Sequence, residues 1–168
     1  MSEIRIYVAC LAAYNSGVLH GGWIDANQDP YEIWNEVSAM LRQSPISNAE
    51  EWAIHDYEGF EGIQISEYEA FDAISEYAEF IEKYGALGGL LIDHCGSVEA
   101  AKTAHDNHYG GEYESVSEFA QQLTEETTTI PENLSFYIDY EKMARDIEIN
   151  DIFTIETAAR EVHIFWSH

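Results

Sequence analysis

Histidine, cysteine and aspartate gather in one stretch of the sequence, and they are the residue types that bind transition metals. Asp93, His94 and Cys95 are consecutive, and His105 and His108 share a helical spacing. A zinc site usually takes three or four such ligands at defined spacing. No second ligand pair supports a site here, so we expect no metal. A metal-dependent regulator that uses this histidine region stays open as an alternative.

The sequence contains none of the short motifs that mark common catalytic sites. It has no Walker-type phosphate loop, no GxSxG elbow, no HExxH and no GxGxxG between a strand and a helix. Carboxylate pairs identify nothing, because 32 acids create many accidental pairs. We therefore predict that the protein is not an enzyme and needs no cofactor.

Negative charge is the dominant feature of the chain. The 32 Asp and Glu oppose 7 Lys and Arg, which gives a formal net charge of -25 over 168 residues. Eleven acids lie in residues 43–82 and nine in residues 103–141, and neither stretch has Lys or Arg. Because phosphate binding needs clustered basic residues, we expect no nucleic-acid binding, and anionic membranes are disfavoured on the same ground.

Three explanations of this charge stay open on composition alone: adaptation of a cytosolic protein to high salt, an enzyme without a recognised motif, and mimicry of DNA. Duplex DNA carries one charge per about 1.7 Å, so 25 excess charges match about 40 Å of duplex. This is an upper bound, because carboxylates on all sides cannot face one partner. It is enough charge to fill a DNA-binding groove.

The N-terminal third has the pattern of a small sheet with one helix. Residues 4–8, 18–25 and 52–57 are rich in β-branched and aromatic side chains, and turn residues separate the first two. Between the second and third, Asp29 and Pro30 form a helix start, and apolar residues follow at helical spacing. We expect a three-stranded unit with an amphipathic helix.

Ser66 begins a possible capping box, which predicts a helix over residues 67–84 that ends at the glycines Gly85, Gly88 and Gly89. Apolar side chains share one face of that helix, and the other face is a stripe of carboxylates without cations. Further short helices are expected over residues 90–101. This is the acidic helical middle of the chain.

The last third combines helix and strand signals. A capping box at residues 115–118 predicts a short helix, Pro131 predicts the start of another, and residues 152–156 and 162–166 resemble strands. The fold class is therefore α+β. We expect three small consecutive domains: an antiparallel sheet plus helix (1–64), the helical middle (65–108) and a mixed α/β unit (109–168).

Cys10 and Cys95 belong to no disulfide or zinc pattern, so we expect free thiols. The N-terminus has no basic region typical of a signal peptide, and no apolar run is long enough to span a membrane. We expect a cytoplasmic protein.

Three blocks resemble the ArdA antirestriction family. Residues 6–25 contain its YNxGxLxGxW pattern, and residues 52–58 and 137–147 agree with later blocks, in order. The resemblance implies an elongated three-domain homodimer that occupies the DNA-binding groove of type I restriction-modification enzymes, on their methyltransferase core, and so protects incoming DNA. It also implies an antirestriction motif near residues 120–132, close to the dimer contact.

Mimicry predicts that carboxylates stand in for phosphates, on a face of two parts. The first part is Glu67, Glu69, Asp72, Glu76, Glu79 and Glu82. The second part is Glu112, Glu114, Glu118, Glu125 and Glu126. Because charge is distributed over both sets, single substitutions should matter little.

Overall fold

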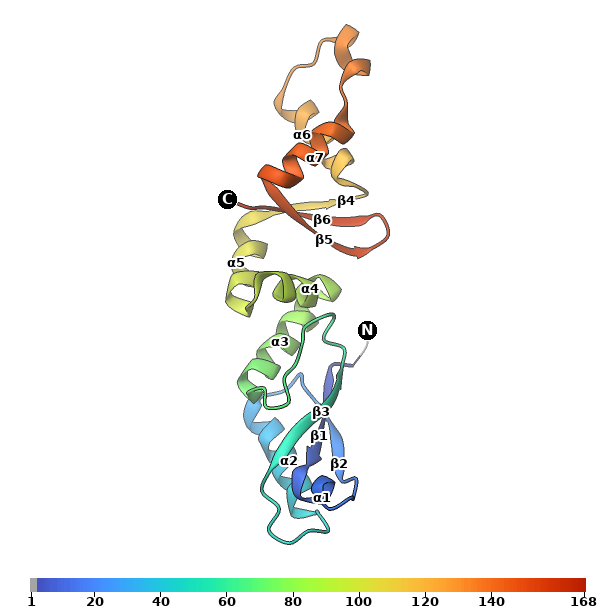
Figure 1. The fold of residues 1–168 in the computed structure, drawn as a ribbon. Coiled ribbons are helices and arrows are strands. Elements are labelled where there is room, and N and C mark those ends of the chain that lie inside the picture. The colour runs from blue at the N-terminus through green and yellow to red at the C-terminus, as the bar shows by residue number, and fades with distance from the viewer. Residues whose placement is uncertain (1–2) are drawn as a thin grey trace. The chain divides into compact units, whose positions relative to one another are not determined.

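The computed structural model describes residues 3–168, and the chain falls into two compact units, Met1–Val98 and Glu99–His168 (Figure 1). Each unit combines helices with an antiparallel sheet, so the predicted α+β class is confirmed. The boundaries of three domains stay a prediction. Among the described residues, no helix is long and apolar enough to cross a membrane.

The sheet of the first unit has the order β2-β1-β3, with all pairs antiparallel. Its strands are β1 (Arg5–Cys10), β2 (Gly21–Asp25) and β3 (Trp52–Glu58). The expected strands are thus confirmed, and the connection from β1 to β2 contains a short helix, α1 (Leu11–Asn15). Alternation along β1 buries Ile6 and Val8 completely.

Helix α2 (Pro30–Arg42) begins as predicted. The Asp29 side chain accepts a hydrogen bond from the Tyr31 backbone N–H at 2.8 Å, and Pro30 occupies the first helical position, where no N–H is needed. The buried face of α2 consists of Ile33, Val37 and Leu41, at helical spacing. This face packs on the sheet.

Helix α3 (Phe71–Tyr84) begins four residues later than predicted, and the capping box at Ser66 is wrong. Residues 66–69 form a turn, in which the Glu69 N–H donates to the Ser66 carbonyl at 3.2 Å. The Glu67 carbonyl accepts from the Ile54 N–H of β3 at 2.8 Å, so the segment runs beside the sheet. This long-range bond competes with helix formation.

Only one of the three expected helix breakers breaks a helix. Gly85 has φ of +66° and separates α3 from α4 (Ala86–Cys95), whereas Gly88 and Gly89 lie buried inside α4. A Cβ at Gly89 would lie 2.4 Å from the Cβ of Glu61, and one at Gly88 would lie 2.9 Å from the Phe80 carbonyl oxygen. These glycines permit close packing.

The second unit has a sheet of order β4-β6-β5. Its strands are β4 (Tyr109–Tyr113), β5 (Ile152–Ala158) and β6 (Glu161–Trp166), and α5 (Val98–His108) leads into β4. The last two strands are confirmed, but β4 was not predicted. Its two glycines locally indicate a break, yet β4 pairs with β6, about 50 residues away in the sequence.

Helices α6 (Val116–Thr127) and α7 (Tyr140–Asn150) pack against each other and against the sheet of the second unit (Figure 1). The Ser115 side chain accepts from the Glu118 N–H at 3.1 Å, which confirms Ser115 as the predicted helix cap, whereas the Glu118 carboxylate accepts from the Glu114 N–H instead of the Ser115 N–H. The helix expected at Pro131 is instead a 3₁₀ helix, η1 (Glu132–Tyr137), and α7 has its own cap, Asp139.

Candidate functional site

Both units are strongly acidic by themselves. Residues 1–98 hold 17 acids against 3 Lys and Arg, a net charge of -14, and residues 99–168 hold 15 against 4, a net charge of -11. Neither unit carries a compensating basic surface, because so few cations exist. A partner that binds either unit electrostatically must therefore bring positive charge.

The first predicted set of carboxylates is centred on α3. Asp72, Glu76, Glu79 and Glu82 are all exposed, while Ile74, Ala78 and Ile81 are buried on the other side. From Asp72 to Glu82 the helix rises about 15 Å, so the carboxylates recur about every 5 Å along its axis. One strand of DNA carries a charge about every 3.4 Å, which is a similar density.

Lys83 bounds this stripe at its C-terminal end. It follows Glu79 by four residues, and its Nζ lies 5.2 Å from the centroid of the Tyr84 ring. No basic group lies within 4.0 Å of a stripe carboxylate in the described part of the chain. The negative charge of the stripe is therefore not neutralised by ion pairs.

Glu67 and Glu69 lie before α3 rather than on it, so four of the six carboxylates of the first set lie on the helix. Glu67 is exposed and Glu69 is half-buried. The pKa of Tyr77 is raised by burial and then by the negative charges of Glu69 and Glu76. Glu69 thus contributes to the same local field as the stripe, although it belongs to the preceding turn.

The second predicted set begins on β4 and around the start of α6. Glu112 and Glu114 are exposed, whereas Glu118 is half-buried and its Oε2 accepts from the Glu114 N–H at 2.8 Å. Glu118 therefore has a structural role at the helix start. Glu112 lies 3.5 Å from His163 Nε2, and this contact is an ion pair only when the histidine is protonated.

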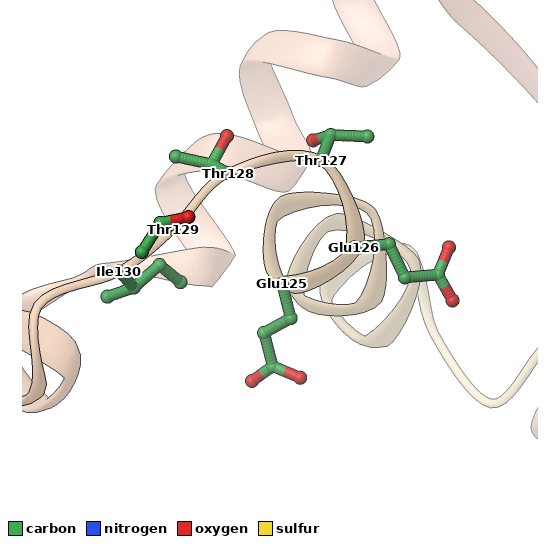
Figure 2. A pocket seen from close by; sticks show the side chains of 6 residues that line it. All are labelled: Glu125, Glu126, Thr127, Thr128, Thr129 and Ile130. Carbon is green, nitrogen blue, oxygen red and sulfur yellow. The ribbon is translucent and has the colours of Figure 1, made fainter.

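Glu125 and Glu126 complete this set at the other end of α6. Both are exposed, and Figure 2 shows them leaving the last turn in different directions, beside the three threonines 127–129 that line the same hollow. The Glu125 Oε1 accepts from Gln121 Nε2 at 3.0 Å. Because the C-terminus of a helix carries partial negative charge, it adds to the negative charge of these two carboxylates.

A buried histidine, His163, was missed by sequence reasoning. Its Nδ1 lies 2.7 Å from the Tyr109 hydroxyl, and its Nε2 lies 3.1 Å from the Thr157 hydroxyl. Burial lowers the pKa of His163, and the charges of Glu112 and Glu161 partly oppose this. A single histidine within a strand gives no signal in a sequence, because its partners come from β4 and β5.

The residues considered as metal ligands do not converge in the described part of the chain, where no group of three or more His, Cys, Asp or Glu side chains is placed to hold an ion. His105 stacks on Tyr109, with ring centroids 5.3 Å apart. Cys10 is buried and Cys95 is half-buried, and both are free thiols as expected. Burial raises the pKa of Cys95.

Comparison with protein families decides the assignment. The model of the antirestriction protein (ArdA) family matches residues 6–161, nearly the whole chain. The chain belongs to the ArdA antirestriction family. Comparison with curated proteins gives no match.

ArdA proteins are DNA mimics that inhibit type I restriction enzymes, and they are not enzymes themselves. The unneutralised carboxylates of both units fit this activity, because a DNA-binding groove selects for dense negative charge. The target of this ArdA-family chain is accordingly a type I restriction-modification enzyme.

Proposed function

We propose that the carboxylates of the two predicted sets form the surface that the restriction enzyme binds in place of DNA. The observation that carries this proposal is the exposed stripe on α3, which has four carboxylates at about 5 Å spacing and no ion-paired cation within residues 3–168. The second predicted set, which lies in the second unit, adds negative charge at both ends of α6.

Binding on this surface is driven by ion release. Carboxylates at phosphate-like density hold cations from solution, and the Lys and Arg side chains of the enzyme's groove displace these cations on binding. Affinity should therefore fall steeply as salt rises. The enzyme would meet the inhibitor in the cytoplasm, where incoming DNA is attacked, and its methyltransferase core is the part that we expect to bind.

We also propose that the protein acts as a homodimer through the segment Glu132–Tyr137. No residue of this 3₁₀ helix is buried, and it exposes Leu134, Phe136 and Tyr137, with Phe136 91% exposed. Exposed aromatic residues in such a group are typical of a protein interface. The substitution Phe136→Ser should shift the mass measured by sedimentation from dimer to monomer, and an unchanged mass would contradict this contact.

Matched neutralisation tests which carboxylates face the enzyme. One variant changes Asp72, Glu76, Glu79 and Glu82 to Asn or Gln. The control variant changes the same number of exposed acids outside both sets: Glu141, Asp146, Glu148 and Glu156. Because both variants lose four charges, long-range attraction falls equally and only local contact differs.

We expect the α3 variant to inhibit a type I enzyme at least about fourfold less well than the control variant, since four lost contacts at about 0.2–1 kcal/mol each sum to at least about 0.8 kcal/mol. Equal inhibition by the two variants would contradict the proposed face. Loss of all inhibition after one neutralisation, in a correctly folded protein, would contradict a distributed surface.

A further inference from the structure

A row of four aromatic rings crosses the surface of the first unit. The rings of Trp34, Phe71, Trp52 and Tyr68 follow one another with centroid distances of 6.4, 4.6 and 6.3 Å. They come from α2, the first residue of α3, the first residue of β3 and the turn before α3. Trp34 is 44% exposed and Tyr68 is 63% exposed, so both ends of the row meet solvent.

Two surface hollows lie along this row, and each combines aromatic rings with carboxylates. The residues that line the first are Leu11, Glu50, Glu51, Trp52 and Tyr68. The second is lined by Asp29, Pro30, Tyr31, Phe71 and Asp72. Each hollow thus has two rings and two acids, and neither is lined by Lys, Arg or His.

The two hollows are joined by the stack of Trp52 on Phe71, whose planes differ by 26°. Some capacity of the carboxylates is already used, because Asp29 accepts from the Tyr31 N–H. A carboxylate has further lone pairs, and Glu50, Glu51 and Asp72 are exposed. Both hollows can therefore accept hydrogen bonds from a donor that lies on a ring.

We propose that this aromatic row, with its two acidic hollows, binds arginine side chains of a partner protein. It rests on the proposed function, because the DNA-binding groove of a restriction enzyme is the source of those arginines. In each hollow a guanidinium lies on an aromatic face while its N–H groups donate to a carboxylate. The protein then imitates the flat, stacking surface of bases as well as the charge of phosphates.

The chemistry of the hollows selects arginine over the other candidates. A planar guanidinium stacks on aromatic rings and offers a fork of donors to a carboxylate, whereas an ammonium is a compact, strongly hydrated charge. A phosphate or nucleotide is repelled by the acids. An apolar segment would leave the carboxylates desolvated without partners.

Two synthetic peptides test the proposal directly. They are acetyl-Gly-Arg-Gly-Arg-Gly-amide and its lysine counterpart, which have equal charge and length. Each is titrated into the full-length protein and followed by NMR of the tryptophan indole N–H groups. Trp34 and Trp52 report on the row, while Trp23 and Trp166 are internal controls.

We expect the arginine peptide to bind about two- to fivefold more tightly than the lysine peptide, the range for a cation–π contact at an exposed site. The shifts should concentrate on Trp34 and Trp52. Equal affinity of the peptides, or shifts spread evenly over all four indoles, would overturn the proposal.

Variants without a change in net charge separate stacking from charge. Tyr31→Leu combined with Tyr68→Leu removes the exposed ring of each hollow, and both sites, 68% and 63% exposed, are exposed enough for the fold to survive. Tyr14→Leu is the matched control, because Tyr14 is 52% exposed and lies outside the row, in an edge-to-face contact with His55. The arginine preference should disappear in the double variant and persist in the control. Its persistence in the double variant would refute the role of the rings.

Displacement of DNA from a type I enzyme distinguishes this inference from the proposed function. If the wild-type protein displaces DNA but shows no arginine preference, the inference alone fails. If the preference is present without displacement, the hollows bind arginine as inferred and the proposed function fails.

Discussion

Glu76 lies in the middle of the α3 stripe, four residues after Asp72 and three before Glu79. Like charges at these spacings destabilise a helix by about 0.2–0.5 kcal/mol per pair. Gln has nearly the helix propensity of Glu, so Glu76→Gln removes two repulsions and little else. We predict that the variant stabilises the first unit by about 0.4–1 kcal/mol at low salt, although it weakens or leaves unchanged the inhibition of the enzyme.

Urea unfolding followed by tryptophan fluorescence measures this effect, because Trp23, Trp34 and Trp52 belong to the first unit. With a urea slope of about 1.5–2 kcal/mol/M, the midpoint should rise by about 0.2–0.7 M. In about 1 M salt the screening length is about 3 Å and the gain should vanish.

The same substitution at Glu99 is the control, followed by circular dichroism. Glu99 lies in the first turn of α5, three residues before Lys102, so its charge is favourable there and Glu99→Gln should destabilise. If Glu76→Gln left the midpoint unchanged or lowered it at low salt, the stripe would not be under the repulsion that its geometry implies.

Three further predictions concern packing and titration. Gly89→Ala should destabilise the first unit by about 1–3 kcal/mol, because its Cβ would lie 2.4 Å from that of Glu61, whereas Gly22→Ala, with nothing within 4 Å, should be tolerated in the same urea assay. A titration followed by NMR should give His163 a pKa below about 6.5, because burial disfavours the charged imidazole. The neutral side chain therefore contributes to the free energy of unfolding above that pH, and this contribution is lost as the pH falls through the folded pKa. A higher pKa would contradict the burial of His163. Cys95 should be alkylated at pH 8 more slowly than a free thiol, and Cys10 only on unfolding; rapid reaction of both would show that neither is buried.

Local signals predicted those elements whose ends are fixed by local hydrogen bonds. Helix α2 begins where Asp29 and Pro30 place it, and α6 begins at Ser115, with Glu118 completing the cap. Both caps join residues at most four positions apart, so a short stretch of sequence is enough to identify the hydrogen-bond partners. The strands β1 and β6 were predictable for a similar reason, because runs of β-branched and aromatic residues favour them.

Long-range contacts explain the failures. The capping box predicted at Ser66 does not form, because the Glu67 carbonyl accepts a hydrogen bond from β3. Gly89 lies inside α4 instead of ending a helix, because its missing side chain permits close packing on Glu61. Trp23 is 39% exposed on the edge strand β2, and the Arg5 guanidinium of β1 lies 4.5 Å from its ring centroid. No local pattern reveals any of these partners.

The acidic surface was predictable from the sequence in its amount but not in its arrangement. Charge counts give the net charge of each part, and periodicity gives the stripe on α3. The sequence does not reveal that Glu69 leaves the helix or that Glu118 is used as a cap, since both depend on where a helix begins. The aromatic row was equally hidden, because its four rings come from separate elements.

Displacement of DNA tests the central claim most directly. The protein is titrated into a purified type I methyltransferase core bound to labelled duplex DNA, at about 50 mM and about 200 mM salt. Mimicry predicts displacement at low salt, with an apparent affinity that falls at least about tenfold at the higher salt. Absence of displacement at micromolar protein, or displacement that does not depend on salt, would contradict the account.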